Sequence, residues 1–443
     1  MEVIHERCAG LDVHKETVVG CVRVRDGGEV RRFATTTRGL LELADWVREA
    51  GCTRVAMEAT GVYRKPVWHL LESEFELVLA NPAHIRNVPG RKSDMKDASW
   101  IAELLAHGLI RASFVPPGPI LELRDLTRTH KQLIRELVQH KQRLQKVLED
   151  ANVKLASVVS DVVGESGRRM IEALIAGETY ANQLAALGSG RLAASREALA
   201  EALHGKITLH HRFLLNQHLQ MIEHLKQTVT QFEAQIEAAV NPFRAAAERL
   251  VTIPGVSTTA AHVIIAEIGV DMSRFPTVGH MRSWAGLCPQ LNQSVGKIMS
   301  RRLRNGAPWL KPVPVQCAWA ATRSKNSYLH GQFLRLKVRR GPKKAVLAVA
   351  ASILTAAYYL LRNQEPYRDL GPLYLARLTR IEPPNGWRVA SKNSVMRSRF
   401  AKQQQLNQDL FLGRFWIGTA RNGAEPAYAM TSTSRPESAS ASA

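Results

Sequence analysis

Four carboxylates in the first hundred residues stand where they could act together on a metal ion. Asp12 ends one apolar run, in Gly-Leu-Asp-Val, and Glu58 ends another, in Ala-Met-Glu-Ala-Thr-Gly. Asp94 and Asp97 lie three residues apart at the start of a helical pattern, so they share one face of its first turn. The plainer interpretation of this last pair is a helix cap.

Strands and helices must bring these acids together. The residue patterns predict strands over 8–13, 17–24, 29–36, 54–58 and 75–80, with helices over 39–49 and from 62 to about 73. This order predicts an α/β domain, a mixed sheet covered by helices, that ends near residue 115. If the strands that carry Asp12 and Glu58 run parallel, their carboxyl ends lie side by side and the four acids converge.

Such a convergence has an electrostatic cost that points to cations. Two bare carboxylates in contact repel by about 4 kcal/mol at an effective dielectric of about 20. Clusters with oxygen ligands alone suit Mg²⁺, and two such ions can clamp the attacking and leaving oxygens of a phosphodiester. The acids therefore predict a site for two Mg²⁺ ions.

The charge balance predicts a polyanionic partner. The 443 residues carry 60 Lys and Arg against 39 Asp and Glu, a net charge of +21. Nucleic acid is the first candidate and an acidic membrane surface the second. Residues 272–364 hold 16 Lys and Arg and no acid. Ordinary surfaces mix both signs, whereas contact with a phosphate backbone explains a single sign and implies strong salt dependence.

A tight turn at 253–257 runs into a helical pattern and looks like the hairpin of a helix-hairpin-helix element. There, backbone N–H groups at a helix start hold a DNA phosphate; a plain helix-start turn is the alternative. We predict nucleic-acid contacts from this turn, from the segment before Asp94 and from the acid-free stretch, at Arg91, Lys92, Gly255, Ser257, Lys297, Arg301, Arg302, Arg304, Arg339, Arg340, Lys343 and Lys344.

The remaining patterns set the domain organisation. Long helical patterns over 121–155, 191–202 and 211–240 predict a coiled-coil or bundle spacer that sets distance and dimerises. We expect four parts: the acidic catalytic domain at 1–115, the helical spacer at 116–245, a mainly α-helical basic domain at 246–375, and a partly disordered tail at 376–443.

The chain is expected in the cytoplasm. Its five cysteines are an odd number without a Cys-x-x-Cys pair, which argues against a disulfide framework or a zinc site and for a reducing compartment. The N-terminus has no signal-peptide pattern. Residues 345–361 carry no charge, but they are too few and too rich in Ala for a membrane span, so we expect a buried or oligomer-forming helix.

Ser294 is a second candidate for chemistry, in Asn-Gln-Ser-Val-Gly-Lys. A serine hydroxyl beside Lys297, Arg301 and Arg302 could attack a phosphodiester while these cations stabilise the developing charge. The ordinary alternative is a serine in a turn next to a glycine.

Three motifs carry a family resemblance: Gly-Leu-Asp-Val-His-Lys at 10–15, Met-Glu-Ala-Thr-Gly-Val-Tyr at 57–63, and Pro-Gly-Arg-Lys-Ser-Asp-Met-Lys-Asp-Ala at 89–98. Residues 7 to 375 resemble the bacterial insertion-sequence transposases of the DEDD type. The resemblance implies a RuvC-like domain of the RNase-H fold, with its acid tetrad at Asp12, Glu58, Asp94 and Asp97.

The resemblance extends to Trp-Ala-Gly-Leu-Cys-Pro at 284–289 and to the block around Ser294. It implies that Ser294 is a nucleophile that links covalently to double-stranded DNA at the element ends and the target. It also implies a composite site in which the acids of one subunit work with the serine of another, hence a homo-oligomer, a dimer or tetramer. A structured non-coding guide RNA is implied by the resemblance alone.

Two departures from the family pattern stand near this block. Val295 follows the serine where the family has a small residue, and Pro312 and Pro314 interrupt the helix that follows. A proline inside a helix costs about 3 kcal/mol or more, although the first turn tolerates it.

These observations predict an Mg²⁺-dependent, RNA-guided DNA transposase without a membrane partner. A hydrolytic nuclease of the Holliday-junction type, with the same acids and no covalent step, is the first rival. A decayed transposase that binds nucleic acid without catalysis is the second. A basic membrane-surface protein that uses residues 345–361 is the third.

Overall fold

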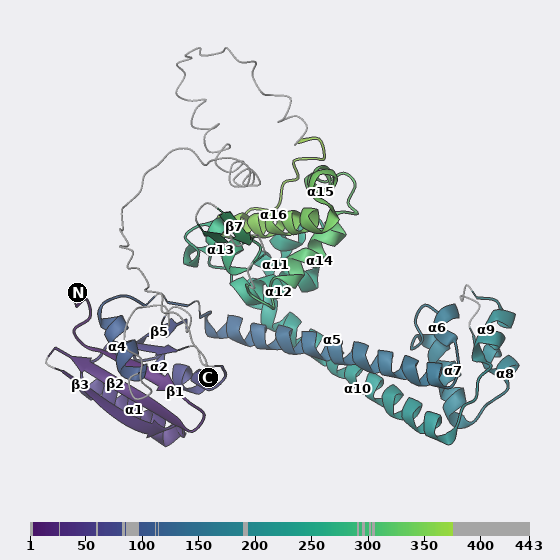
Figure 1. The fold of residues 1–443 in the computed structure, drawn as a ribbon, viewed down its shortest axis with the longest axis horizontal. Helices are drawn as coiled ribbons and strands as arrows, with labels where there is room; N and C mark the ends of the chain where they lie inside the picture. Colours follow the sequence, from purple (N-terminus) through teal and green to yellow (C-terminus); the bar gives the residue numbers. More distant parts are fainter. Residues whose placement is uncertain are drawn as a thin grey trace, which may run out of the picture. The chain divides into compact units, whose positions relative to one another are not determined.

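The computed structural model describes residues 3–25, 27–58, 61–81, 85, 97–110, 112–113, 115–188, 194–289, 292–294, 297–300, 303 and 306–374. The chain divides into two compact units, Met1–Gly118 and Pro119–Ala443. A five-stranded mixed sheet belongs to the first unit, and the chain after it is largely helical (Figure 1).

The sheet of the first unit has the strand order β3-β2-β1-β4-β5. Its strands are β1 (Cys8–Val13), β2 (Thr17–Val24), β3 (Gly27–Ala34), β4 (Arg54–Glu58) and β5 (Glu76–Ala80). β2 pairs antiparallel with β1 and β3, whereas β4 runs parallel to β1 and β5. The mixed sheet and the parallel pairing expected from the sequence are therefore confirmed.

Helices cover both faces of this sheet. α1 (Thr37–Glu49) and α2 (Arg64–Leu71) pack on one face, where Leu11 and Val55 meet Leu43 and Leu71 in the core. α4 (Asp97–Ala106) covers the other face through a smaller apolar cluster. The third strand lies at 27–34 rather than at the predicted 29–36, because Thr36 caps α1 by accepting a hydrogen bond from the Gly39 backbone N–H at 3.3 Å.

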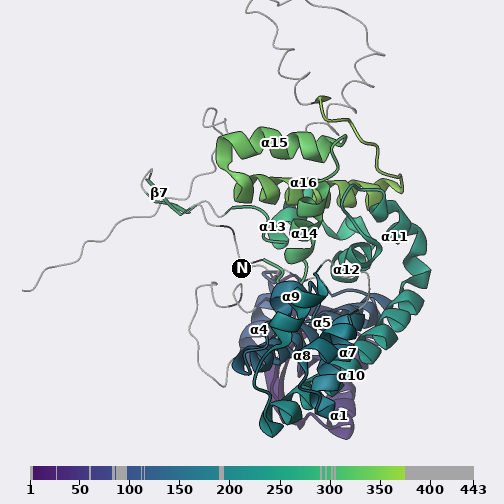
Figure 2. The same ribbon diagram turned by 90° about the vertical axis from the view of Figure 1, so that its right-hand side faces the viewer.

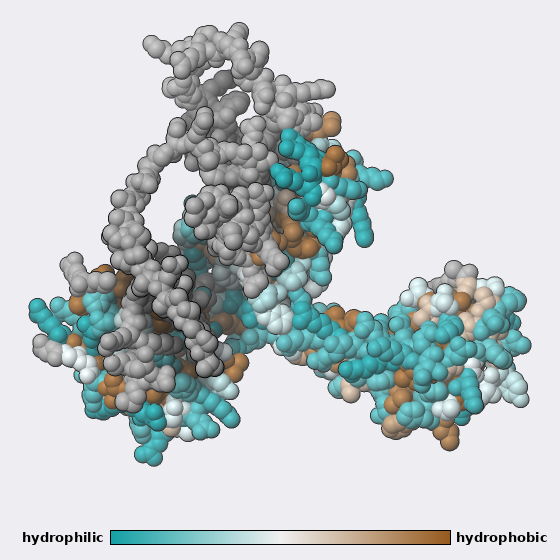
Figure 3. Space-filling model, viewed as in Figure 1, coloured by the Kyte–Doolittle hydropathy of each residue, from teal (hydrophilic) through white to brown (hydrophobic). Residues whose placement is uncertain are grey.

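The second unit begins with a long antiparallel helical hairpin of α5 (Gly118–Asp150) and α10 (Leu209–Val240) (Figure 1). Its two helices contact through Asp150 with His211, His140 with His218, and Glu233 with His130. Four shorter helices lie between them in sequence and cap one end of the hairpin: α6 (Leu155–Val158), α7 (Glu165–Ala176), α8 (Ala181–Ala186) and α9 (Arg196–Leu203). The face seen in Figure 3 is mostly hydrophilic along the hairpin. Dimerisation through this hairpin stays a prediction.

The other end of the hairpin carries a helical domain with one core. It contains the short helices η2 (Asn241–Phe243) and η3 (Met272–Arg274), the strands β6 (Asn292–Ser294) and β7 (Lys297–Ser300), and the helices α11 (Arg244–Val251), α12 (Thr258–Ile268), α13 (Val278–Trp284), α14 (Pro312–Ala321), α15 (Tyr328–Arg340) and α16 (Pro342–Asn363). α15 lies along α16 (Figure 2). The domain is joined to the hairpin by Ile120 and Leu123 of α5, which share its core.

α16 is the apolar helix expected over 345–361, and it is buried. In the described part of the chain it is the one helix long and apolar enough to cross a membrane, yet 72% of its apolar window lies inside the domain. The two prolines that precede α16 in sequence do not interrupt a helix. α14 begins at Pro312, so Pro312 and Pro314 lie in its first turn, where N–H groups have no intrahelical acceptor.

Candidate active site and nucleic-acid interface

Asp12 and Glu58 lie next to each other at one edge of the sheet. β1 and β4 run parallel with Leu11 opposite Met57, and Asp12 and Glu58 are the next residue on each strand. They share the face of the sheet that α4 covers, since Gly10 and Ala56, two residues earlier on each strand, lie on that face. The Asp12 side chain is 14% exposed, and its Oδ2 lies 3.1 Å from Nε2 of the exposed His14.

α4 brings Asp97 to the same edge. The Ile4 N–H donates to the carbonyl of Ala106, at the end of the helix, at 2.8 Å, and the Cys8 thiol lies 3.6 Å from the Ala102 carbonyl. The C-terminus of α4 therefore lies by the start of β1, and its first residue, Asp97, lies by the end of β1. The partial positive charge of a helix N-terminus favours carboxylates there.

The close approach of α4 depends on Gly10. A Cβ at this residue would lie 2.4 Å from the backbone N of Ala102 and 2.4 Å from the carbonyl oxygen of Ala98. Any residue with a Cβ at this position would collide with the helix backbone, so only glycine lets α4 lie this close to β1. Gly10 thus sets the distance between the first turn of α4 and the strand that carries Asp12.

The structure therefore brings three of the four predicted acids to one edge, and Asp94 lies outside the described residues, as do Arg91 and Lys92. Among the residues that the structure describes, no group of three or more His, Cys, Asp or Glu side chains could hold a metal ion. The three acids supply carboxylate oxygens, the ligands that Mg²⁺ prefers, and His14 lies beside one of them.

Arg64 is a partly buried cation that the sequence reasoning did not single out. It is the first residue of α2, which follows the strand that ends at Glu58. Burial lowers the pKa of its guanidinium. A cation at the start of α2 places positive charge soon after Glu58 in the chain.

Ser294 lies in a small antiparallel hairpin of the second unit. It ends β6, and its backbone is paired with Lys297 at the start of β7. An isolated bridge between Pro289 and Leu303 extends this pairing. In Figure 2, β7 stands to the side of the helices of its domain. Val295, Arg301, Arg302 and Arg304 lie outside the described residues.

The turn before α12 is built as a helix start. Ser257 caps the helix by accepting a hydrogen bond from the Ala260 N–H at 3.2 Å. Gly255 has a φ of +86°, and a Cβ there would lie 2.4 Å from the Cys317 carbonyl oxygen of α14. Ser257 and the two threonines after it are exposed, which leaves this helix start open to solvent. Phosphate contact by this turn stays a prediction.

The corner between α15 and α16 gathers exposed cations. Arg339 and Arg340 end α15, where the helix dipole favours positive charge, whereas Lys343 and Lys344 lie in the first turn of α16, where it does not. All four are exposed, and the first turn of α16 contains no acid. These four like charges repel one another, and a neighbouring polyanion would reduce that repulsion.

Known protein families match both the segment with the acids and the segment with Ser294. Residues 9–153, which include the four acids, match a profile of DEDD transposases, and residues 247–333, which include Ser294, match the profile described as transposase IS116/IS110/IS902 family. A "pilin gene-inverting protein" of Moraxella bovis is 28% identical over 161 residues, which is 33% of this chain and 47% of the relative. The alignment thus spans about half the length of that relative. This chain belongs to the IS116/IS110/IS902 family of transposases.

Proposed function

We propose that this protein is a transposase that cuts DNA strands at the ends of a mobile element and at a target and rejoins them in exchange. The observation that supports this most is that Asp12 and Glu58 end neighbouring parallel strands and Asp97 begins the helix packed on them, inside the segment that matches the DEDD transposases. In this proposal the first unit is a RuvC-like, RNase-H-type catalytic domain.

Asp12, Glu58, Asp94 and Asp97 are the residues that would hold Mg²⁺ at this edge. When bound, two such ions would stabilise the negative charge on the attacking and leaving oxygens of a phosphodiester. The protein supplies rigidity: β1 and β4 fix two carboxylates by backbone pairing, and Gly10 fixes the approach of the helix that carries the third. His14, 3.1 Å from Asp12, limits the orientation of that carboxylate.

Ser294 is proposed as the nucleophile. Its Oγ forms a bond to phosphorus, the bond from phosphorus to one sugar oxygen breaks, and that oxygen takes up a proton as the serine loses one. A sugar hydroxyl of the other strand then bonds to this phosphorus and loses its proton, the bond from phosphorus to Oγ breaks, and the serine takes up a proton. Lys297, opposite Ser294 in the hairpin, with Arg301 and Arg302, would stabilise the charge that develops on the phosphate oxygens.

The partners follow from the same proposal. Double-stranded DNA is the substrate, and a structured RNA is the guide that chooses it. A homo-oligomer would let the acids of one subunit act with the serine of another. The acid-free stretch of 272–364 and the exposed cations at the corner of α15 and α16 support a polyanionic partner.

A hydrolytic nuclease is the rival that uses the same acids. The relative's printed name describes gene inversion, a reaction that must rejoin the strands it cuts, and this favours exchange over hydrolysis. A decayed, non-catalytic binding protein is the other rival. It predicts nucleic-acid binding together with indifference to the loss of Asp12.

Recombination between element-end DNA and target DNA tests the proposal, with RNA transcribed from the region beside the gene and Mg²⁺ present. We expect Asp12→Ala, Glu58→Ala and Asp97→Ala to abolish exchange and to keep DNA binding. Asp45→Ala, which removes an exposed acid from α1, is the matched control and should recombine normally. Chelation of Mg²⁺ should reproduce the effect of Asp12→Ala.

Ser294→Ala separates the rivals. Exchange that persists in Ser294→Ala would overturn the serine step, and cutting without any rejoining in the unmodified protein would favour the hydrolytic nuclease. Exchange that is unchanged in Asp12→Ala would overturn the catalytic role of the acidic edge.

A further inference from the structure

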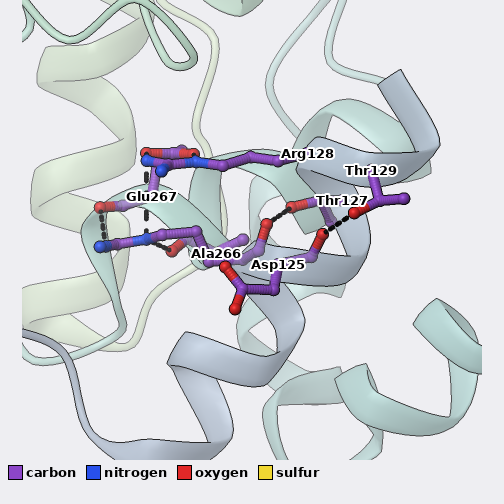
Figure 4. Close-up of polar contacts among 7 residues, drawn as sticks. Asp125, Thr127, Arg128, Thr129, Ala266 and Glu267 are labelled. Atoms are coloured by element: carbon purple, nitrogen blue, oxygen red, sulfur yellow. Dashed lines mark hydrogen bonds and ion pairs between the residues drawn. The ribbon is translucent and has the colours of Figure 1, made fainter. Parts of the chain in front are cut away.

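One buried acid ties α5 to the helical domain. Arg128 donates from Nε and Nη2 to the two Glu267 oxygens at 2.8 Å each, and Arg124 donates to the carbonyls of Ala266 at 2.9 Å and Glu267 at 2.8 Å (Figure 4). The Glu267 side chain is 2% exposed. Since Arg128 engages both of its oxygens, this acid is already neutralised by its own partner.

Two more cations follow Arg128 on α5. Lys131 and Arg135 come three and seven residues later, so they continue along the same helix face. The ring of Trp309 lies in the segment before α14, with its centroid 5.4 Å from Arg128 Cζ, 5.9 Å from Lys131 Nζ and 5.6 Å from Arg135 Cζ. Three cations therefore surround one indole ring, and the acid beside them is already paired.

Lys131 is the least satisfied of the three. Its Nζ is shielded from solvent, and among the residues that the structure describes it has no hydrogen-bond partner. Burial, and then repulsion from Arg135, lowers the pKa of this amine, against a smaller attraction from Glu267. A cation held this way lacks an acceptor, and a buried charge without one is costly.

The excess charge is built into a fixed place. Arg128 is held by Glu267, Trp309 packs against Arg128, and Lys131 and Arg135 lie against the same ring. Two cations in the helical hairpin region show the usual arrangement, since Lys141 lies 3.6 Å from Asp161 and Arg168 lies 2.6 Å from Glu223. The contacts of Lys131 and Arg135 with this ring restrict their side chains before an anion arrives, which reduces the entropy lost on binding.

We propose that Lys131, Arg135 and Trp309 form a binding site for a phosphodiester of a nucleic acid. This inference rests on the proposed function, because it takes its ligand from the substrates of that reaction. A phosphate can accept hydrogen bonds from the exposed Arg135, and Lys131 would give a second one by turning its shielded Nζ outward from beside the Trp309 ring. Trp309 also belongs to the acid-free stretch of 272–364, so no acid of that stretch would repel the backbone.

Binding by the full-length protein tests the site. The probes are single-stranded RNA, single-stranded DNA and duplex DNA of one sequence, measured by fluorescence anisotropy over a range of salt. We expect Lys131→Gln with Arg135→Gln to bind about tenfold more weakly, with a log–log salt slope smaller by about 1 to 2. Arg143→Gln with Lys146→Gln removes the same charge from exposed positions of α5 and is the matched control.

The arms of the test separate the sources of the phosphate. A loss confined to RNA assigns the site to the guide, a loss confined to duplex DNA assigns it to the substrate, and equal losses indicate a shared backbone contact. Lys131→Arg, which keeps the charge, should bind as the unmodified protein does. Equal, small losses in the double variant and in its control would overturn the site.

This outcome is distinguishable from failure of the proposed function. Asp12→Ala should bind all probes normally and lose recombination. If the unmodified protein fails to recombine DNA while the double variant binds weakly, the proposed function is wrong and the phosphate site stands. If recombination occurs and the double variant binds like its control, the site is wrong and the proposed function stands.

Discussion

Replacing Gly10 with alanine should increase the distance between Asp97 and the acids on the strands while leaving every acid in the sequence. The added Cβ would lie 2.4 Å from backbone atoms of Ala98 and Ala102, whereas ordinary contact begins at 3.4 Å, so α4 must retreat by about 1 Å. Overpacking of this kind costs about 1–3 kcal/mol of unfolding free energy. The retreat also carries Asp97, the first residue of α4, away from Asp12.

A misplacement of about 1 Å in a catalytic arrangement can cost about a hundredfold in rate. We therefore expect Gly10→Ala to slow strand cleavage by about a hundredfold while DNA binding stays within about twofold. Cleavage of a labelled element-end DNA measures the rate, and circular dichroism with urea unfolding confirms that the variant is folded. Gly28→Ala is the matched control in the same sheet, because its nearest neighbour is the Val22 carbonyl oxygen at 3.2 Å.

The prediction fails if a folded Gly10→Ala variant cleaves DNA at the unmodified rate. It would mean that the distance between α4 and β1 does not set the geometry in which the acids act. A loss of cleavage that equals the loss in Gly28→Ala would contradict it as well, since it would trace the defect to general destabilisation of the sheet.

Two further predictions concern the second unit. Glu267→Gln should lower the unfolding free energy by about 3 kcal/mol, near the low end for a broken buried pair because the Arg128 side chain is 33% exposed. In urea unfolding, the double variant Glu267→Gln with Arg128→Met should recover most of this loss, and no recovery would contradict the pairing. The Nδ1 atoms of His140 and His218 lie 3.3 Å apart, and burial is the largest cause that lowers the pKa of both imidazoles. The folded state therefore binds fewer protons than the unfolded state, and the unfolding free energy should fall as pH drops below about 6.5. Thermal unfolding at about pH 7.5 and 5.5 measures this, and a loss that His218→Gln fails to reduce would count against the histidine pair.

The placement of Asp12 and Glu58 could be predicted from the sequence because it follows from local pattern. Each acid ends an apolar strand, and parallel pairing of those strands leaves no other outcome than neighbouring carboxyl ends. Asp97 was predictable as a helix start. The direction of its helix was not, because α4 is aligned with β1 by the close approach at Gly10, which depends on atoms nearly ninety residues away along the chain.

The parts that could not be predicted depend on short elements or distant contacts. β6 and β7 have three and four residues, too few for a periodic pattern, so the hairpin that contains Ser294 could not be predicted. Glu267 and Arg128 are 139 residues apart, and no local signal joins them. The cations at 124, 128, 131 and 135 share one helix face by their spacing, but their contact with Trp309, far along the chain, could not be read from that spacing.

The most direct test of the account is whether DNA becomes covalently attached to Ser294 during the reaction. The protein is incubated with element-end DNA, RNA and Mg²⁺, quenched by denaturation, and the DNA-bound peptide is identified by mass spectrometry. We expect an adduct at Ser294 that is absent in Ser294→Ala and in Asp12→Ala, and that returns when these two variants are mixed. Strand exchange that proceeds without any covalent protein–DNA intermediate, or an adduct at another residue, would contradict it.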